Sequence, residues 1–534
     1  MKKVKFSGNL YLLIILILIA FSVKLFFSAV IPLWHTPDEQ AHFSQVAYFV
    51  EFGHMPNGAL DLNKEIYESE VLLGTARSSS GENKFTYHPE YNIEYNLTFV
   101  GVYEKQINNF SDEDRIELVG QEAARYPPLY YILTGIPYQL FYNHGLIERV
   151  FYSRFVSILI GLLMFILCIP ITKLLFPTNK LLQITLLVLM AFHPMLNFVS
   201  SGVTSDNLLN LLFTVVLLIG LLIIKNGLKG KYILGSIVVI FLLYFTKPQF
   251  ALALPILFVA FLLGAFLNKQ INRKTILAFA FLGVLLIILL FLGSKNTDFY
   301  EFIQKFYTED FFPGNSKNTI SVLDFIKVTL NKTIHETIPW YWGVYKWLSL
   351  VLPIEVIRLL NRLMIVAVIG MIIKLLLIFR NKRVKEDYMF IFLLVSSITY
   401  ALGIFYYDFL RFNNLGFSFG IQGRYFFPLI VAHMALLLIG LNAIFPSKFP
   451  LAKTIYVKMI GLSMIGLFLL STWVVLNSYY DLNSLTTFIT QSSQYKPWIY
   501  KGVNLIIILV LNIVLLFLLL IKYLSIDNKS NNSE

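Results

Sequence analysis

Long apolar segments recur along the whole chain of 534 residues, and short polar stretches separate them. Several of these segments exceed the roughly 20 residues that a helix needs to cross the hydrocarbon of a bilayer. No soluble fold could bury so many, and the mean hydropathy of +0.69 agrees. The pattern therefore predicts an all-α integral membrane protein.

The apolar segments predict about twelve transmembrane helices. These cover residues 10–33, 151–175, 181–199, 207–225, 231–246, 249–267, 275–293, 355–379, 388–407, 424–445, 456–476 and 501–523. The first follows a basic N-terminus without a small-residue cleavage site, so we interpret it as an uncleaved signal anchor. We expect residues 1–525 to form a single membrane domain and residues 526–534 to be a disordered cytoplasmic tail.

The acidic residues concentrate in the first loop, residues 34–126, which is the longest polar stretch. Between His35 and Arg125 there are 16 Asp and Glu against six Lys and Arg, whereas the whole chain has a net charge of +12. The remainder therefore carries +22, mostly in short loops between apolar segments. The positive-inside rule places those loops and both termini in the cytoplasm and the first loop outside. The basic total indicates membrane topology and not nucleic-acid binding.

The segment 127–142 is apolar but only about 16 residues long, with Pro127 at its start and Pro137 inside. This is short for a span. The basic loops share one side of the membrane with the N-terminus only if this segment does not cross. We therefore expect it to be a re-entrant or surface-lying helix on the outer side.

Polar side chains follow the first predicted span, in the motif Pro37-Asp38-Glu39, and His42 stands four residues after Asp38. On a helix that begins at Pro37, Asp38 and His42 share one face. The same residues also fit an ordinary helix start, in which Thr36 caps the helix and the acids favour the positive end of its dipole. The motif alone does not separate a catalytic site from a helix cap.

The predicted topology places further charged residues at the same outer face. They are Asp206, Arg125, Lys247 and Arg424. Two acids beside three cations suit a site that binds a lipid phosphate and activates a hydroxyl group. A divalent cation is an open possibility, for which Asp38, Glu39 and His42 are the candidate ligands. No other cofactor is expected, and the single cysteine, Cys168, excludes a disulfide framework within the chain.

These motifs resemble those of the GT-C superfamily of polytopic glycosyltransferases and, more narrowly, the DUF2142 membrane family within it. The resemblance extends to about residue 435. The elements that carry it are Pro37-Asp38-Glu39-Gln40-Ala41-His42-Phe43, Arg125-Tyr126-Pro127-Pro128, Ser205-Asp206-Asn207, Thr246-Lys247-Pro248-Gln249 and Gln422-Gly423-Arg424-Tyr425.

The resemblance implies a GT-C-like architecture and gives roles to these residues. In the aminoarabinose and protein mannosyl transferases the first-loop Asp is essential and a second outer acid is important, which implies catalytic roles for Asp38 and Asp206. Those relatives carry a phosphate-binding Lys where this chain has Tyr126. The candidates for substrate or lipid-phosphate binding are Glu39, His42, Arg125, Tyr126, Lys247 and Arg424.

The implied activity is that of an extracytoplasmic glycosyltransferase of the bacterial plasma membrane. A polyprenyl-phosphate sugar would be the donor, a glycan, lipid or protein of the cell envelope the acceptor, and a single displacement would invert the anomeric carbon. The segment 127–142 and the aromatic stretch 338–347 would line the groove through which the donor enters from the bilayer.

Three other classes of membrane protein stay open. A transporter or flippase of lipid-linked glycans would need charges near the middle of the membrane, where the candidates are Lys24 and His433. A polymerase or ligase of diphosphate-linked oligosaccharides would also use cations at the outer face. A structural or assembly role is the remaining alternative.

Overall fold

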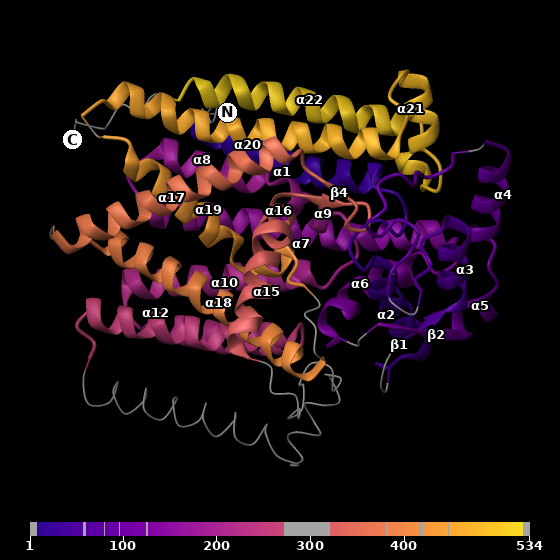
Figure 1. The fold of residues 1–534 in the computed structure, drawn as a ribbon, viewed down its shortest axis with the longest axis horizontal. Coiled ribbons are helices and arrows are strands. Elements are labelled where there is room, and N and C mark those ends of the chain that lie inside the picture. The colour runs from indigo at the N-terminus through magenta and orange to yellow at the C-terminus, as the bar shows by residue number, and fades with distance from the viewer. Residues whose placement is uncertain are drawn as a thin grey trace, which may run out of the picture.

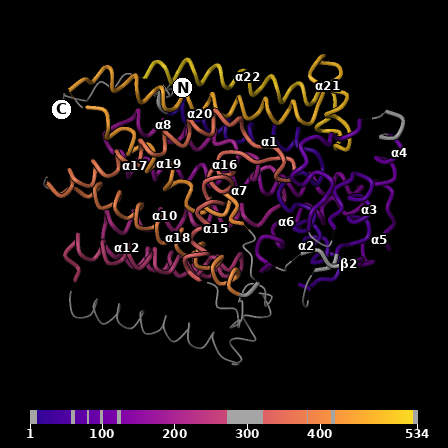
Figure 2. The backbone as a smooth tube through the Cα atoms, in the orientation of Figure 1, coloured from indigo at the N-terminus to yellow at the C-terminus, as the bar shows by residue number. Residues whose placement is uncertain are grey.

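The computed structural model describes residues 8–56, 60–78, 81–95, 97–123, 126–271, 321–380, 383–415, 420–446 and 448–526. Long helices run side by side along the longest axis, and shorter elements gather at one end (Figure 1). Segments from opposite ends of the chain pack together, because the C-terminal helix α22 (Val503–Leu524) lies against α1 (Gly8–Val30), as Figure 2 shows.

Nine helical segments of the described residues are long and apolar enough to cross a membrane, which confirms a multi-pass membrane protein. They are α1, α7 (Leu146–Leu175), α10 (Asp206–Asn226), η1 with α12 (Pro248–Leu252 and Ala253–Leu267), α17 (Ile354–Arg380), α18 (Lys385–Leu415), η4 with α19 (Gly423–Leu429 and Ile430–Ile444), α20 (Pro450–Tyr479) and α22.

The segment predicted to span at 181–199 is broken into α8 (Lys180–Ala191) and α9 (Pro194–Ser200), which meet at a bend of 54°. Pro194 has no N–H group to continue α8. The break is stabilised locally, because Asn197 donates from Nδ2 to the carbonyl oxygen of Ala191 at 2.9 Å. Counting this pair as one span gives up to ten.

Two further expected spans have different outcomes. The segment 231–246 forms α11 (Gly230–Tyr244), whose 15 residues make a helix shorter than the other spans. The segment 275–293 lies outside the described residues, as does the expected tail from residue 527 onward.

The proline-rich segment expected not to cross forms α6 (Leu129–Leu140). Its 12 residues rise about 18 Å, well short of the roughly 30 Å of a hydrocarbon core. It packs between α7 and α2 (Glu39–Phe52), the helix that follows the Pro-Asp-Glu motif. A helix of this length does not cross the hydrocarbon by itself, and its re-entrant or surface-lying placement stays a prediction.

The first loop is a folded cap and not an open loop. Besides α2 it contains β1 (Leu60–Asn63), α3 (Lys64–Leu73), α4 (Leu97–Asn108), α5 (Asp112–Ile116) and β2 (Leu118–Ala123). β1 pairs antiparallel with β2 and so closes the cap on itself. The remaining short elements are α15 (Val322–Lys332), η3 (Thr333–Thr337), α16 (Ile338–Trp342), β3 (Val344–Tyr345), β4 (Leu350–Val351), α21 (Leu485–Ser492) and η5 (Trp498–Tyr500).

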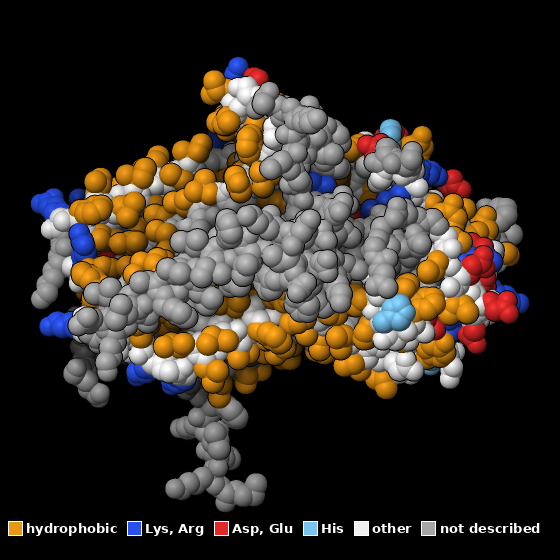
Figure 3. All heavy atoms as spheres, turned by 90° about the horizontal axis from the view of Figure 1, so that it is seen from below, with side chains coloured by type: hydrophobic (Ala, Val, Ile, Leu, Met, Phe, Trp, Pro, Cys, Tyr) orange, Lys and Arg blue, Asp and Glu red, His pale blue; other side chains and the backbone are white. Residues whose placement is uncertain are grey.

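The surface is divided by charge along the long axis. In Figure 3, Lys and Arg side chains gather at the left end, Asp and Glu side chains lie at the right end, and hydrophobic side chains predominate among the described residues between them. Large apolar residues of the long helices are exposed, among them Phe379 of α17 and Phe517 of α22. This distribution is typical of a protein whose long helices contact lipid and whose two ends contact water.

Candidate functional site: two carboxylates bridged by an arginine

Asp38 precedes α2 in an unusual backbone conformation. Its φ of 54° and ψ of 25° lie in the left-handed region, which residues other than glycine seldom adopt. The Asp38 side chain makes no capping hydrogen bond to α2. Thr36, the expected cap, does not cap α2 either, because its hydroxyl has no hydrogen-bond partner among the described residues.

The Asp38 carboxylate instead binds two guanidinium groups. Arg77 lies 2.8 Å from Oδ1 and Arg424 lies 2.5 Å from Oδ2. Burial raises the pKa of the Asp38 carboxyl, but Arg424 and Arg77 outweigh burial and hold that pKa below its usual value. Asp38 is thus ionised throughout the physiological range, while 40% of its side chain stays exposed and can meet a ligand.

Arg424 joins this carboxylate to the second one. From the start of η4 its guanidinium also approaches Asp206 Oδ2 at 3.5 Å, and Gln422 accepts a hydrogen bond from its Nε at 2.8 Å. Asp206 begins α10 and forms a second ion pair with Lys247. The backbone of Lys247 is extended, as the proline that follows it favours, and Lys247 stands immediately before η1.

Tyr126 lies beside Lys247, at the position where the resemblance led us to expect a phosphate-binding lysine. The Lys247 ammonium is 4.5 Å from the centre of the Tyr126 ring. Gln45 holds the Tyr126 backbone from both sides, donating to its carbonyl at 2.5 Å and accepting from its N–H at 3.2 Å. A lysine from another loop thus supplies the cation next to this tyrosine.

His42 completes this side of the cluster as a neutral group. Its ring centre is 5.4 Å from that of Tyr126, and its Nδ1 lies 2.7 Å from the Tyr131 hydroxyl. Burial, followed by the charge of Lys247, lowers the pKa of His42 to about 3. The imidazole therefore contributes hydrogen bonding and shape and carries no charge near neutral pH.

Glu39, which we predicted among the substrate-binding groups, does not join the cluster. Its carboxylate is fully buried against Arg154, with contacts of 2.7 and 2.6 Å, and accepts from the Val203 N–H at 3.1 Å. The described residues contain no group of three His, Cys, Asp or Glu side chains that could hold a metal ion. The trio of Asp38, Glu39 and His42 therefore does not converge. Arg125 lies outside the described residues.

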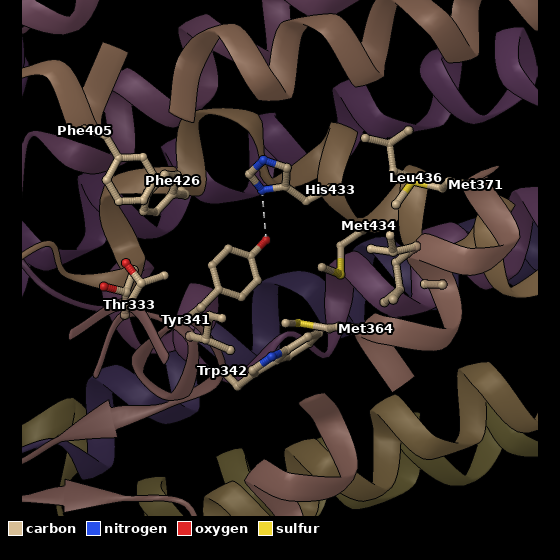
Figure 4. A pocket seen from close by; sticks show the side chains of 15 residues that line it. Thr333, Tyr341, Trp342, Met364, Met371, Phe405, Phe426, His433, Met434 and Leu436 are labelled. Carbon is tan, nitrogen blue, oxygen red and sulfur yellow. Dashed lines mark hydrogen bonds between the residues drawn. The ribbon is translucent and has the colours of Figure 1, made fainter. Parts of the chain in front are cut away.

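Residues of η4, the element that carries Arg424, contribute to the walls of two cavities. One, of about 150 Å³, has Asp38, Arg77 and Arg424 among its lining residues. The other, of about 380 Å³, is almost entirely apolar, and Figure 4 shows Phe405, Phe426 and the methionines around it. Its wall includes part of the aromatic stretch 338–347, although α6 is not among its lining residues.

The family comparison agrees with the motifs. A family model described as "Predicted membrane protein (DUF2142)" matches residues 21–433. The chain belongs to the DUF2142 family. A comparison with curated proteins found no match.

Solved structures of two other membrane proteins are similar to this DUF2142 protein. ArnT from Cupriavidus metallidurans bound to undecaprenyl phosphate is 14% identical, with 96% of this chain and 77% of that chain covered and a TM-score of 0.41. The oligosaccharyltransferase AglB from Archaeoglobus fulgidus, in complex with an inhibitory peptide and a dolichol-phosphate, is 12% identical, with 89% and 56% covered and a TM-score of 0.44. This chain therefore spans about half the length of that oligosaccharyltransferase.

Proposed function

We propose that this protein is an extracytoplasmic GT-C type glycosyltransferase of the bacterial plasma membrane. It would transfer a sugar from a polyprenyl-phosphate donor to a hydroxyl group of a cell-envelope acceptor. The observation that carries this proposal is the bridge that Arg424 makes between Asp38 and Asp206. It places an ionised carboxylate and buried cations around one small cavity.

The charge of the cluster favours an anionic ligand. Arg77, Lys247 and Arg424 face two carboxylates, Asp38 and Asp206, which leaves one net positive charge among these five groups. Arg424 and Lys247 are only 5% and 6% exposed, so water screens that charge poorly. A phosphate group would neutralise it with charge-assisted hydrogen bonds.

The reaction assigned to these groups is a single displacement at the anomeric carbon. The acceptor oxygen forms a bond to this carbon as the bond to the lipid-phosphate oxygen breaks. Asp38 accepts a hydrogen bond from the acceptor hydroxyl and takes its proton as the oxygen attacks. The lipid phosphate leaves as an anion that Arg424 and Lys247 stabilise, so it needs no protonating acid.

The apolar cavity in Figure 4 suits the hydrocarbon chain of the donor. It is lined by Phe426, which is two residues from Arg424, and by Met364, Met371 and Met434. Methionine side chains are flexible and adapt to irregular apolar ligands. A chain lying there would bring its phosphate to the Arg424 side of the cluster.

A complementation experiment tests the proposal. A strain that lacks the protein is compared by mass spectrometry of its envelope glycans with strains that express the wild type, Asp38→Asn or Asp112→Asn. Asp112 is a matched control because it is another first-loop acid, with 81% of its side chain exposed.

We expect the deletion and Asp38→Asn to change the same glycan, and Asp112→Asn to restore it. Membrane-fraction immunoblots and size-exclusion profiles check that each variant is inserted and folded. The proposal is wrong if folded Asp38→Asn protein restores the glycan as the wild type does.

A further inference from the structure

Three consecutive residues between β3 and β4 adopt left-handed backbone conformations. The φ angles of Lys346, Trp347 and Leu348 are 49°, 54° and 66°. None of them is glycine, and such conformations are unfavourable for bulky side chains. Strain of this kind persists only where the surrounding structure enforces it, and it concentrates at ligand sites.

Residues 346–348 form a turn between β3 and β4, which we call the strained tip. Contacts on two sides hold it in place. β3 pairs with β4 at its base, and the Lys346 ammonium donates to Asn92 Oδ1 at 3.0 Å. The Tyr87 N–H donates to the carbonyl oxygen of Trp347 at 3.3 Å. The first-loop cap therefore fixes the tip in place, although the two are far apart in the sequence.

The tip places Trp347 in the wall of the 150 Å³ cavity, which Asp38 also lines. The Arg77 guanidinium lies 4.9 Å from the centre of the Trp347 ring and also binds Asp38. Charged groups share this wall, because Asp38, Arg77 and Arg424 line the same cavity.

These features define the chemistry of a ligand. An aromatic ring offers its negative face to the C–H groups of a sugar ring, while the carboxylate and guanidinium groups in the lining suit its hydroxyl groups. The volume of about 150 Å³ is below the roughly 300–1,000 Å³ of pockets for drug-sized ligands. It fits one sugar ring, whereas an oligosaccharide would not enter.

We propose that this cavity is the glycosyl subsite of the donor, that it takes a single sugar, and that Trp347 determines which sugar is accepted. The inference rests on the proposed function, since it assumes a polyprenyl-phosphate donor. It goes further by assigning the transferred group to one monosaccharide and its recognition to a residue outside the charged cluster.

Binding by the purified full-length protein tests this inference. The probes are undecaprenyl phosphate without sugar and undecaprenyl phosphate carrying glucose, mannose, galactose or N-acetylglucosamine. For the wild type we expect at least one glycosylated lipid to bind about tenfold more tightly than the sugar-free lipid. In Trp347→Leu this preference should fall below about twofold, while the affinity for the sugar-free lipid is kept.

Three further variants make the result interpretable. Trp498→Leu is the matched control, because Trp498 is 68% exposed and should keep the wild-type preference. Trp347→Phe retains a smaller aromatic ring, so it should keep part of the preference for the glycosylated lipid. A partial preference shows that the loss in Trp347→Leu comes from recognition and not from misfolding. Arg424→Gln should weaken both kinds of lipid, since it removes a phosphate-binding cation.

Each alternative outcome has a distinct meaning. If folded Trp347→Leu keeps the full preference, or if no glycosylated lipid binds more tightly to the wild type than the sugar-free lipid, the glycosyl subsite is wrong. If the wild type binds neither kind of lipid, the proposed function fails as well.

Discussion

Asp38 and Glu39 are neighbours in the sequence, yet they belong to two different charged regions of the molecule. Glu39 and Arg154 form a pair in which neither side chain is exposed. Asp38 belongs to a cluster with Arg77, Arg424, Asp206 and Lys247, and 40% of its side chain is exposed. One region is sealed and the other is open.

The two regions also differ in how their charge is balanced. In the sealed pair one carboxylate meets one guanidinium, and the remaining Arg154 donors bind the carbonyl oxygens of Ser28, Ile31 and Pro32 at 3.0–3.2 Å. In the open cluster the cations outnumber the carboxylates. The sealed pair is satisfied within itself, whereas the open cluster is where we propose that a ligand binds. Sequence position alone does not separate these roles.

The largest effect is expected at the open cluster. Asp38→Asn keeps the size of the side chain but removes the carboxylate that we propose takes the proton of the acceptor, so the transfer rate should fall about 10²- to 10⁴-fold. The measurement is the initial rate with the donor and acceptor identified by the glycan comparison. The melting temperature should change little, because Arg424 retains Asp206 and Gln422 as partners. A rate within threefold of the wild type would assign catalysis elsewhere.

The next effect concerns the sealed pair and appears in stability. Glu39→Gln leaves the Arg154 guanidinium buried without its counter-charge. This should lower the free energy of unfolding by about 3–5 kcal/mol. Thermal unfolding in detergent, followed by size exclusion of the heated samples, measures the loss against the Asp38→Asn variant. Equal melting temperatures for the two variants would remove the distinction between the regions.

A double replacement gives a smaller effect and sharpens the same comparison. In Glu39→Leu with Arg154→Met both charges of the pair are removed, so about half of the stability lost in Glu39→Gln should return. Recovery stays partial because the three carbonyl oxygens that Arg154 contacts lose a donor. If the double variant is no more stable than the single one, the loss does not come from an unpaired charge.

The smallest effect is a pH dependence at the edge of the open cluster. The pKa of His42 is about 3 in the folded protein, against an ordinary value of 6.5, so the unfolded chain binds the extra proton between these values. The stability that neutral His42 contributes is complete above pH 6.5 and is lost as the pH falls toward 3. When the pH is lowered from 7.5 to 5, the free energy of unfolding should fall by roughly 2 kcal/mol more for the wild type than for His42→Gln.

Asp38 does not obscure this test. Its pKa is lowered, so its contribution to stability is present above its ordinary value near 3.8 and is lost only at more acidic pH. Unfolding curves at pH 5 and 7.5 for both proteins give the answer. Parallel losses in the wild type and His42→Gln would show that His42 is not the group that titrates.

Much of this arrangement could be predicted from the sequence, because hydropathy and loop charge act through a single physical constraint, the bilayer. That constraint located most of the long helices, and the structure brings Asp38, Asp206, Lys247 and Arg424 together at one end of the bundle. Their roles stay predictions. The bilayer does not determine the fold of the first loop, so its helices and the β1–β2 pair were not foreseen.

The residues that the sequence did not reveal depend on contacts between distant segments. Arg77 stands in an irregular stretch without periodicity, and the one available signal was that it is among few cations in an acidic loop. Arg154 lies within an apolar helix and meets Glu39 from 115 positions away. Successive residues on a helix point about 100° apart, so an acid next to Asp38 could face an entirely different partner.

Arg154 also has a mechanical consequence. Its single guanidinium ties the end of α1 and the start of α2 to α7, and through Glu39 it reaches Val203, just before Asp206. These contacts join the segments that carry the two carboxylates, so the separation of Asp38 and Asp206 depends on one buried guanidinium.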